Sequence, residues 1–189
     1  MLDWGMLGWV AHHLSATTLA VVFALAVVHK LRDFPRFQAS LMAYEIIPDL
    51  FVRLFAPLVV GLEAAAVGVL LLHEGRGPLL AFTLLGVYSM AIGINMARGK
   101  TEIDCGCGDM PTPLSSWLLL RNLVLMGLAL GAVGHPVAQG SPAAWLLVAA
   151  GVVCLLSFYV IVEHLLANVP FLRNSFGGSF ERSYGRRHG

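Results

Sequence analysis

Two cysteines separated by a single residue are the most chemically distinctive feature of this sequence. Cys105 and Cys107 stand in the string Cys105-Gly106-Cys107-Gly108. Cysteines at this spacing can form a disulfide if the turn brings their Cα atoms to roughly 5.5–6 Å, and the two glycines remove steric barriers to the unusual backbone that this needs. Strain in so small a ring makes the bond more reducible, and hence a better oxidant. The pattern favours thiol–disulfide exchange.

Two other interpretations of this pair stay open at this point, a pair of metal ligands and two incidental loop thiols. A closed zinc site takes four ligands, and residues 98–111 around the pair contain no histidine. We therefore expect no metal. The third cysteine, Cys154, stands alone in an apolar run, where a thiol is expected to pack as a small hydrophobe.

Four polar residues in or near apolar segments are candidates for holding a cofactor. Glu63 lies near the middle of an apolar run, and a carboxylate inside a membrane indicates either a functional site or a structural hydrogen bond to a neighbouring helix. Asn95 could be that partner, or could bind a cofactor carbonyl. Arg121, followed by Asn122, could pair with an acid or face the cysteine loop. Lys30, at a helix end, is expected to extend towards the headgroups.

The composition shows what kind of molecule must position these residues. Hydrophobic residues make up 58% of the 189 residues and charged residues only 12%, about half the charged share of a typical soluble domain. A single soluble core of this size could not bury so much apolar surface, so we expect contact with a lipid bilayer. No basic cluster is interleaved with aromatic residues, and nucleic acid is therefore not expected as a partner.

The apolar runs predict an all-α, polytopic membrane protein. About five transmembrane helices are expected, over residues 14–31, 50–72, 78–97, 113–133 and 142–167. Thr112-Pro113 and Ser141-Pro142 are N-cap and first-turn signals for the last two. We expect one transmembrane domain over residues 1–168 and a flexible polar tail over residues 169–189. The N-terminus lacks the basic region of a signal peptide and is expected to be retained within the first membrane helix.

A short segment between the first two spans has a different character. In residues 34–49, Phe37, Leu41 and Tyr44 recur at helical spacing with polar residues between them, which predicts an amphipathic helix in the membrane interface. The first and third connections lie on the same side of the membrane. The amphipathic segment can therefore meet the cysteine loop and cover it.

Charge counting places that side in the cytoplasm. Lysine and arginine concentrate around the first and third connections and in the tail, whereas the second connection has only Arg76 and the fourth has none. The positive-inside rule then assigns the cysteine loop to the cytoplasmic face. Disulfides, however, form in oxidising compartments such as the periplasm, so the two arguments disagree.

The order of motifs resembles the MauE family of methylamine utilisation proteins, within the wider DoxX-like membrane family. The resemblance covers roughly residues 17–165, and its most specific part is Asp-Cys-Gly-Cys-Gly with Arg-Asn downstream. The motifs that carry it are His29-Lys30-Leu31, Phe37, Tyr44, Ile47-Pro48, Pro57, Glu63, Asn95-Met96-Ala97-Arg98-Gly99, Ile103-Asp104-Cys105-Gly106-Cys107-Gly108 and Arg121-Asn122.

The resemblance implies a membrane thiol–disulfide oxidoreductase that helps to mature the β (small) subunit of methylamine dehydrogenase. It implies a thioredoxin-like partner, MauD, an inner-membrane location with the cysteine loop at the periplasmic face, and a four-helix bundle like those of vitamin K epoxide reductase and DsbB, with one further helix. Electrons would pass to a ubiquinone-like quinone. By this analogy Cys105 exchanges with the partner and Cys107 faces the quinone.

Two other functions remain open. The protein could be a non-catalytic chaperone, export or docking factor for the β-subunit or MauD. It could also import reducing equivalents from the cytoplasm, which would suit a cytoplasmic cysteine loop, although a single cysteine pair on one side of the membrane argues against this.

Overall fold

The computed structural model describes residues 4–72, 76–106, 113–133 and 140–162, and nearly all of them are helical. In chain order the helices are α1 (Trp4–Arg32), α2 (Phe34–Ala43), α3 (Asp49–Leu71), α4 (Gly77–Ala97) and α5 (Ser116–Gly131), followed by a helix over Pro142–Val162. Within the described ranges the sole β-type pairing is an isolated antiparallel bridge between Asp104 and Pro113. The all-α prediction is confirmed.

The chain divides into two compact units after Val152. The first contains α1 to α5 and the beginning of the last helix. The second is described only as far as Val162 and is helical there. The predicted polar tail, residues 169–189, and the end predicted for the last span, residues 163–167, lie outside the described residues.

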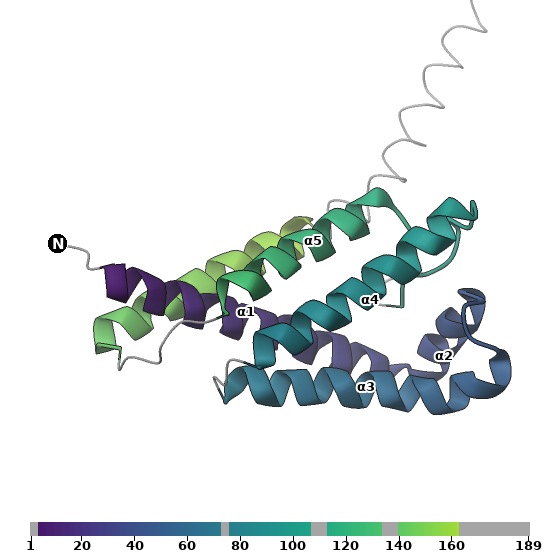
Figure 1. Cartoon of the computed structure of the whole chain (residues 1–189), viewed down its shortest axis with the longest axis horizontal. Coiled ribbons are helices and arrows are strands. Elements are labelled where there is room, and N and C mark those ends of the chain that lie inside the picture. Colours follow the sequence, from purple (N-terminus) through teal and green to yellow (C-terminus); the bar gives the residue numbers. More distant parts are fainter. Residues whose placement is uncertain (1–3, 73–75, 107–112, 134–139, 163–189) are drawn as a thin grey trace, which may run out of the picture. The chain divides into compact units, whose positions relative to one another are not determined.

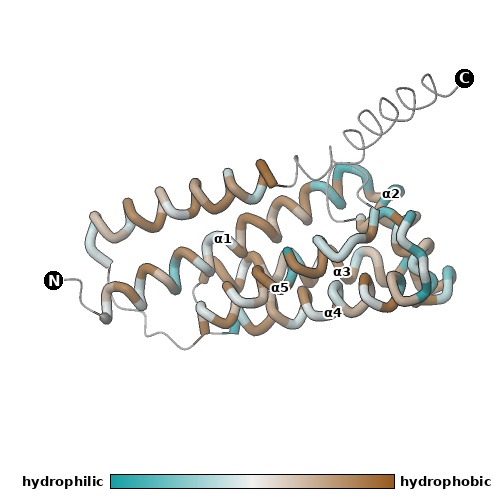
Figure 2. The backbone as a smooth tube through the Cα atoms, turned by 90° about the horizontal axis from the view of Figure 1, so that it is seen from above, coloured by the Kyte–Doolittle hydropathy of each residue, from teal (hydrophilic) through white to brown (hydrophobic). Residues whose placement is uncertain are grey.

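Four of the helices are long and apolar enough to cross a membrane: α1, α3, α4 and Pro142–Val162. This is consistent with the predicted multi-pass membrane protein, and Figure 2 shows the apolar character running along the helices. The 16 residues of α5 rise about 24 Å, less than the roughly 30 Å of a bilayer's hydrocarbon core. A fifth crossing therefore stays a prediction.

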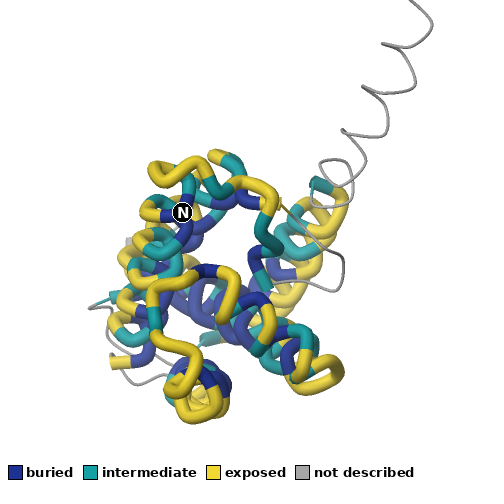
Figure 3. Tube along the Cα trace, turned by 90° about the vertical axis from the view of Figure 1, so that its right-hand side faces the viewer, coloured by how far each residue is buried: buried dark blue, intermediate teal, exposed yellow. Residues whose placement is uncertain are grey.

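The bundle of the first unit is built from α1, α3, α4 and α5, with α1 packed on α3 and α5, and α4 packed on α5 and α3 (Figure 1). Small residues at the contacts let the helix backbones approach closely. The shared core consists of Ala16, Leu19, Ala20, Phe23, Ala66, Leu70, Ala81, Leu84, Leu85, Leu125 and Ala129. Figure 3 shows buried positions facing between helices and exposed positions facing outward; many of the exposed side chains are large and apolar, as a lipid-facing surface requires.

The first helix begins well before the predicted residue 14, at Trp4. The polar residues His12 and His13 directly precede the predicted start, but both side chains are buried inside the bundle. His12 Nδ1 donates to the Ala132 carbonyl at 2.7 Å, and His13 Nδ1 donates to the Trp9 carbonyl at 2.9 Å. Since these hydrogen bonds satisfy the ring donors, the helix continues through both residues.

The predicted boundaries of the later helices agree with the structure to different degrees. The bounds of α3 and α4 agree with the predictions to within one residue. In contrast, α5 begins at Ser116, after an extended Ser115, because Pro113 takes part in the bridge to Asp104 instead of opening the helix. Thr112, the predicted cap, lies outside the described residues. The cap predicted at Ser141 is confirmed, since its Oγ accepts a hydrogen bond from Ala144 N at 3.2 Å.

Candidate functional site

The end of α4 sends the chain into the cysteine loop through a Schellman turn. Gly99 has a φ of +75°, the left-handed conformation that glycine adopts without a Cβ penalty. Its N–H donates to the Met96 carbonyl at 3.0 Å, and Lys100 N donates to the Asn95 carbonyl at 2.9 Å. This pairing satisfies the last carbonyls of the helix and accounts for the glycine that follows Arg98 in the sequence.

The glycine between the two cysteines is required by both its conformation and its surroundings. Gly106 has a φ of +66°, and its N–H donates to Asp104 Oδ1 at 3.3 Å. A Cβ at this position would lie 3.1 Å from Ser40 Cβ and 3.5 Å from Phe37 Cδ2. The absence of a side chain therefore lets the loop lie directly against α2.

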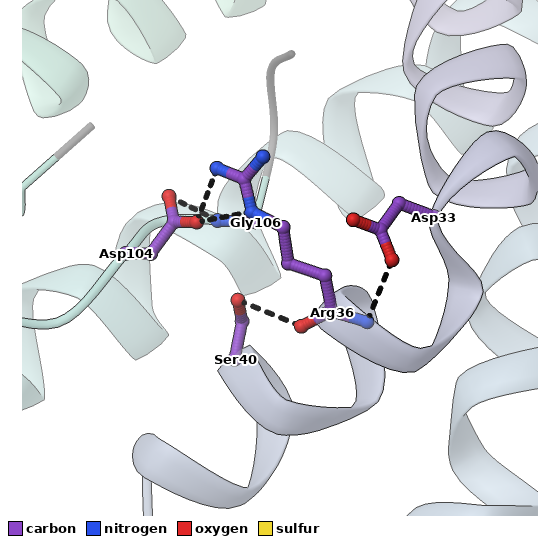
Figure 4. A network of polar contacts seen from close by, with 5 residues as sticks. All are labelled: Asp33, Arg36, Ser40, Asp104 and Gly106. Atoms are coloured by element: carbon purple, nitrogen blue, oxygen red, sulfur yellow. Dashed lines mark hydrogen bonds and ion pairs between the residues drawn. The ribbon is translucent and has the colours of Figure 1, made fainter. Parts of the chain in front are cut away.

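An ion pair fastens the loop to α2 (Figure 4). Arg36 Nε and Nη2 both donate to Asp104 Oδ2, at 3.1 and 2.8 Å. The helix that carries Arg36 is itself held in place, because Asp33 at its N-cap accepts from Arg36 N at 3.2 Å and a proline follows in the first turn. The predicted meeting of the amphipathic segment and the cysteine loop is confirmed.

A second tie joins the other end of α2 to the end of α4. Glu45 forms an ion pair with Lys100, and its backbone carbonyl accepts from Arg98 Nη1 at 3.5 Å. The hydrogen bond and positive charge of Lys100 lower the pKa of the Glu45 carboxyl, with a smaller contribution from Arg98. The helix was predicted to extend to residue 49 but ends at Ala43, since the chain turns at Glu45 with a positive φ of 47°.

A cavity of about 70 Å³ lies beneath this cover and is lined by Cys105. The Cys105 residue is only 9% exposed, so its side chain belongs to the interior of the site. The other lining residues come from α1 to α4 and the loop: Lys30, Phe37, Ser40, Leu41, Tyr44, Val59, Tyr88, Ala91, Ile92 and Gly106. Phe37 and Tyr44, predicted to form one apolar face of the amphipathic helix, are buried as expected, and Leu41 is half-buried.

Lys30, which lines the cavity, takes part in a buried ion pair that the sequence did not predict. Lys30 Nζ donates to Glu63 Oε1 and Oε2 at 2.7 and 2.9 Å, and the two side chains are 4% and 1% exposed. Tyr88 Oη also donates to Glu63 Oε1, at 2.7 Å. The partner of Glu63 is therefore Lys30 with Tyr88, and the suggestion of Asn95 was wrong. The prediction that Lys30 extends to the headgroups was wrong too, because a buried carboxylate holds it inside.

The three remaining candidates lie on α4 and α5. Asn95 and Asn122 are almost fully buried, at 0% and 1% exposure. Asn95 Nδ2 donates to the Ala91 carbonyl at 3.1 Å, and Asn122 Oδ1 accepts from Arg121 Nη2 at 3.4 Å. Asn95 Oδ1 and Asn122 Nδ2 have no hydrogen-bond partner within the part of the chain that the structure describes. Buried amide atoms are costly to leave unsatisfied, and these two are candidates for a ligand.

The other two cysteines, Cys107 and Cys154, are not part of the described site. Cys107 lies outside the described residues. Cys154 is exposed on the last helix, so the expectation that it packs inside was wrong.

These features define a class: a helical, multi-pass membrane protein in which a short amphipathic helix covers a cysteine loop above a buried ion pair. A family comparison narrows the class. Residues 7–135 match the family described as methylamine utilisation protein MauE, and the chain belongs to this family. The matched range contains all the candidate site residues.

Individual relatives agree with this assignment. The chain is 39% identical over 130 residues to the methylamine utilization protein MauE of Paracoccus denitrificans, covering 67% of each chain. It is 35% identical over 123 residues to the protein of that name from Methylophilus methylotrophus, covering 62% of this chain and 65% of the relative. For the Methylorubrum extorquens relative the identity is 39% over 121 residues, covering 61% and 63%. No solved structure matches the chain significantly.

Proposed function

We propose that this MauE-family membrane protein is a thiol–disulfide oxidoreductase whose reactive group is the Cys105–Cys107 pair. Its task would be disulfide formation in the β-subunit of methylamine dehydrogenase, with a thioredoxin-like protein of the MauD type as the exchange partner. The observation that carries the proposal is the burial of Cys105 in a cavity next to a charged, hydrogen-bonded network. An incidental loop thiol would have no need of such an environment.

The proposed exchange moves two electrons. A thiolate of the partner attacks one sulfur of the Cys105–Cys107 disulfide, forming a mixed disulfide and releasing the other sulfur as a thiolate. The partner's second thiol, once deprotonated, then attacks the mixed disulfide. The partner leaves with a disulfide, and both cysteines of this protein remain as thiols. Re-forming their bond requires a two-electron acceptor.

A membrane quinone of the ubiquinone type is the proposed acceptor, because the site lies among membrane helices. Such a group would supply two-electron, two-proton chemistry when bound. The described residues offer atoms that fit it: Asn122 Nδ2 could donate to a quinone carbonyl, and Asn95 Oδ1 could accept from a quinol hydroxyl. Arg121, bonded to Asn122, would orient that amide. Glu63, already occupied by Lys30 and Tyr88, is better suited to supporting the site than to binding the quinone.

The proposed membrane arrangement has five crossings, with α5 as the short fourth one, in a bundle of the vitamin K epoxide reductase and DsbB kind. The cysteine loop would face the periplasm of a bacterial inner membrane. Three basic residues at this end are already paired with carboxylates, Lys30 with Glu63, Arg36 with Asp104 and Lys100 with Glu45. The positive-inside rule counts lysines and arginines whatever their acidic neighbours, so the periplasmic placement rests on the oxidising compartment that disulfide chemistry requires.

The decisive experiment replaces the cysteines in cells that depend on this protein to mature methylamine dehydrogenase. C105S, C107S and the double variant should each abolish correctly disulfide-bonded β-subunit, whereas C154S, which changes an exposed cysteine outside the site, should not. The measurement is the fraction of β-subunit in its oxidised form, with membrane levels of each variant checked by immunoblot. Full maturation by the double variant would favour the alternative, a non-catalytic docking or export factor.

Thiol labelling from one side of the membrane tests on which side the cysteine loop lies. Spheroplasts are treated with a membrane-impermeant maleimide, with and without prior reduction. We expect Cys105 and Cys107 to be labelled from outside only after reduction. If they are labelled only after lysis, the loop is cytoplasmic and the periplasmic oxidase is ruled out.

A further inference from the structure

We infer that Lys30, held in place by Glu63 and Tyr88, supplies the positive charge that stabilises the thiolate of Cys105 inside the cavity. The inference rests on the proposed thiol exchange and adds to it a role for each cysteine. Cys105 is the interior sulfur that leaves as a thiolate, and Cys107 is the sulfur that the partner attacks. This order is the reverse of the one implied by analogy with quinone-linked oxidases.

The burial of Cys105 indicates which of the two sulfurs the partner can attack. A thioredoxin-like partner must bring its thiolate in line with the sulfur that it attacks, and Cys105 is 9% exposed beneath α2. Phe37 and Ser40 of α2 lie against Gly106, so the loop has no room on that side for an incoming protein. When the partner attacks Cys107, the S–S bond breaks, and its electron pair remains on Cys105 Sγ.

A thiolate formed there needs a counter-charge. Most of the cavity wall is apolar, and in a low-dielectric setting an isolated anion is strongly disfavoured. Among the described residues that line the cavity, Lys30 is the one with a cationic side chain. Its Nζ lies 5.3 Å from the centroid of the Phe37 ring and 5.7 Å from that of the Tyr88 ring, so the ammonium group sits between two aromatic rings that both line the cavity.

The buried carboxylate of Glu63 holds the positive charge of Lys30 at the cavity. Lys30 lines the cavity, but Glu63 does not, and Glu63 is completely buried behind it. The pair therefore places its cationic member at the cavity that Cys105 also lines, and its carboxylate outside that lining. Two hydrogen bonds from Lys30 and one from Tyr88 satisfy the carboxylate. Glu63 and Tyr88 thus act as positioning residues, because their hydrogen bonds hold the Lys30 side chain at the cavity, where an unpaired charge would be too costly to bury.

The other titratable groups around Cys105 do not replace Lys30. Asp104, its neighbour in the chain, is neutralised by Arg36. Tyr44, at the end of α2, and Tyr88, from α4, also line the cavity, and the Tyr88 hydroxyl donates to Glu63. The oriented Lys30–Glu63 pair should thus dominate the titration of the Cys105 thiol.

The test measures that titration directly, in the full-length protein in detergent micelles. A C107S/C154S background leaves Cys105 as the only thiol, and the rate of its alkylation by iodoacetamide is followed against pH. In this background the pKa of Cys105 is expected below the ordinary thiol value of about 8.5. K30M/E63Q, which removes both charges while keeping similar volumes, should raise it by about one unit or more.

Further variants separate an electrostatic role from a structural one. K30R keeps the cation and should leave the titration close to that of the parent background. K30E/E63K keeps a buried pair but turns the carboxylate towards the cavity, and should raise the pKa beyond the value in K30M/E63Q. K100M/E45Q is the matched control, because it removes a more exposed ion pair at the same end of the bundle and should leave the titration of Cys105 unchanged.

The inference is overturned if K30M/E63Q titrates like the parent background. That result would leave the proposed function intact, because function is judged separately by β-subunit oxidation in the cysteine variants. Conversely, a shifted titration together with full maturation by C105S/C107S would uphold the role of Lys30 and remove the oxidase proposal.

Discussion

The two ends of the bundle both bury polar side chains, but they do so in different ways. At the cysteine-loop end the buried polar groups include an ion pair, formed by Lys30 beside a cavity and Glu63. At the other end, about 25 Å along α1, His12 and His13 donate to backbone carbonyls and pack with aromatic rings. Trp9 stacks on His13 with centroids 4.0 Å apart and meets Trp145 edge-on at 4.9 Å.

The difference teaches how to separate a chemical site from structural polarity. Histidine rings that donate to nearby carbonyls and pack against tryptophans are explained by folding alone. An ion pair buried beside a cysteine is not, because burying two charges often costs more than their attraction returns. We therefore expect substitutions at the histidine–tryptophan end to affect stability alone, and those at the cysteine-loop end to affect both stability and thiol chemistry.

The largest effect is expected from breaking the buried ion pair on one side only. K30M leaves the Glu63 carboxylate buried without its cation and should lower the free energy of unfolding by about 3–5 kcal/mol. K30M/E63Q removes both charges and should recover most of that loss. The measurement is denaturant unfolding in mixed micelles. If K30M is no less stable than the double variant, the two side chains are not coupled as the structure indicates.

A substitution at the histidine–tryptophan end should lower the stability of the protein without changing the titration of Cys105. In G140A the added Cβ would overlap the ring of Trp9, a rigid neighbour, and should cost about 1–3 kcal/mol. G127A is the matched control, since a Cβ there meets nothing within 4 Å and alanine favours a helix over glycine. Both variants should keep the parent titration of Cys105. A shifted titration in G140A would mean that the two ends communicate.

The packing of the cysteine loop on α2 can be tested by substituting two glycines that share a left-handed conformation. G99A introduces backbone strain alone, because a Cβ there meets nothing within 4 Å, whereas G106A adds a contact of 3.1 Å with Ser40 Cβ. We expect a loss of about 1 kcal/mol for G99A and about 1 kcal/mol more for G106A. G106A should also increase the alkylation rate of Cys105, as the loop moves off α2. Equal losses in the two variants would show that the packing on α2 contributes nothing.

The smallest effect concerns the exposed tie between α2 and α4. The pKa of Glu45 is lowered from its ordinary 4.5 by Lys100, so folding weakens proton binding there. The stabilisation is fully present above the unfolded pKa and is lost as the pH falls through the lower folded pKa. Unfolding measured between pH 6 and about pH 3 should show a slightly shallower acid loss in E45Q than in the parent protein. An identical acid dependence would mean that the pair does not stabilise the fold.

The sequence by itself determined the broad architecture and singled out the cysteine pair. Runs of apolar residues fixed the bounds of α3 and α4, since membrane helices follow local composition, and a serine before Pro142 fixed the start of the last helix. Counting crossings brought the amphipathic segment to the cysteine loop, and the Arg36–Asp104 bond confirms that meeting. The spacing of the two cysteines identified the chemistry to test.

Only the tertiary structure decided which polar groups share a site. The pairing of Lys30 with Glu63 depends on how α1 and α3 are rotated and tilted against each other, and no local pattern encodes that. The same holds for the burial of Cys105, which follows from Gly106 lying against α2. The early start of α1 depends partly on the same packing, because His12 finds its acceptor on Ala132, far along the chain, whereas His13 donates to Trp9 one turn earlier in the helix. Local sequence sets which helices form, whereas long-range packing sets which side chains meet.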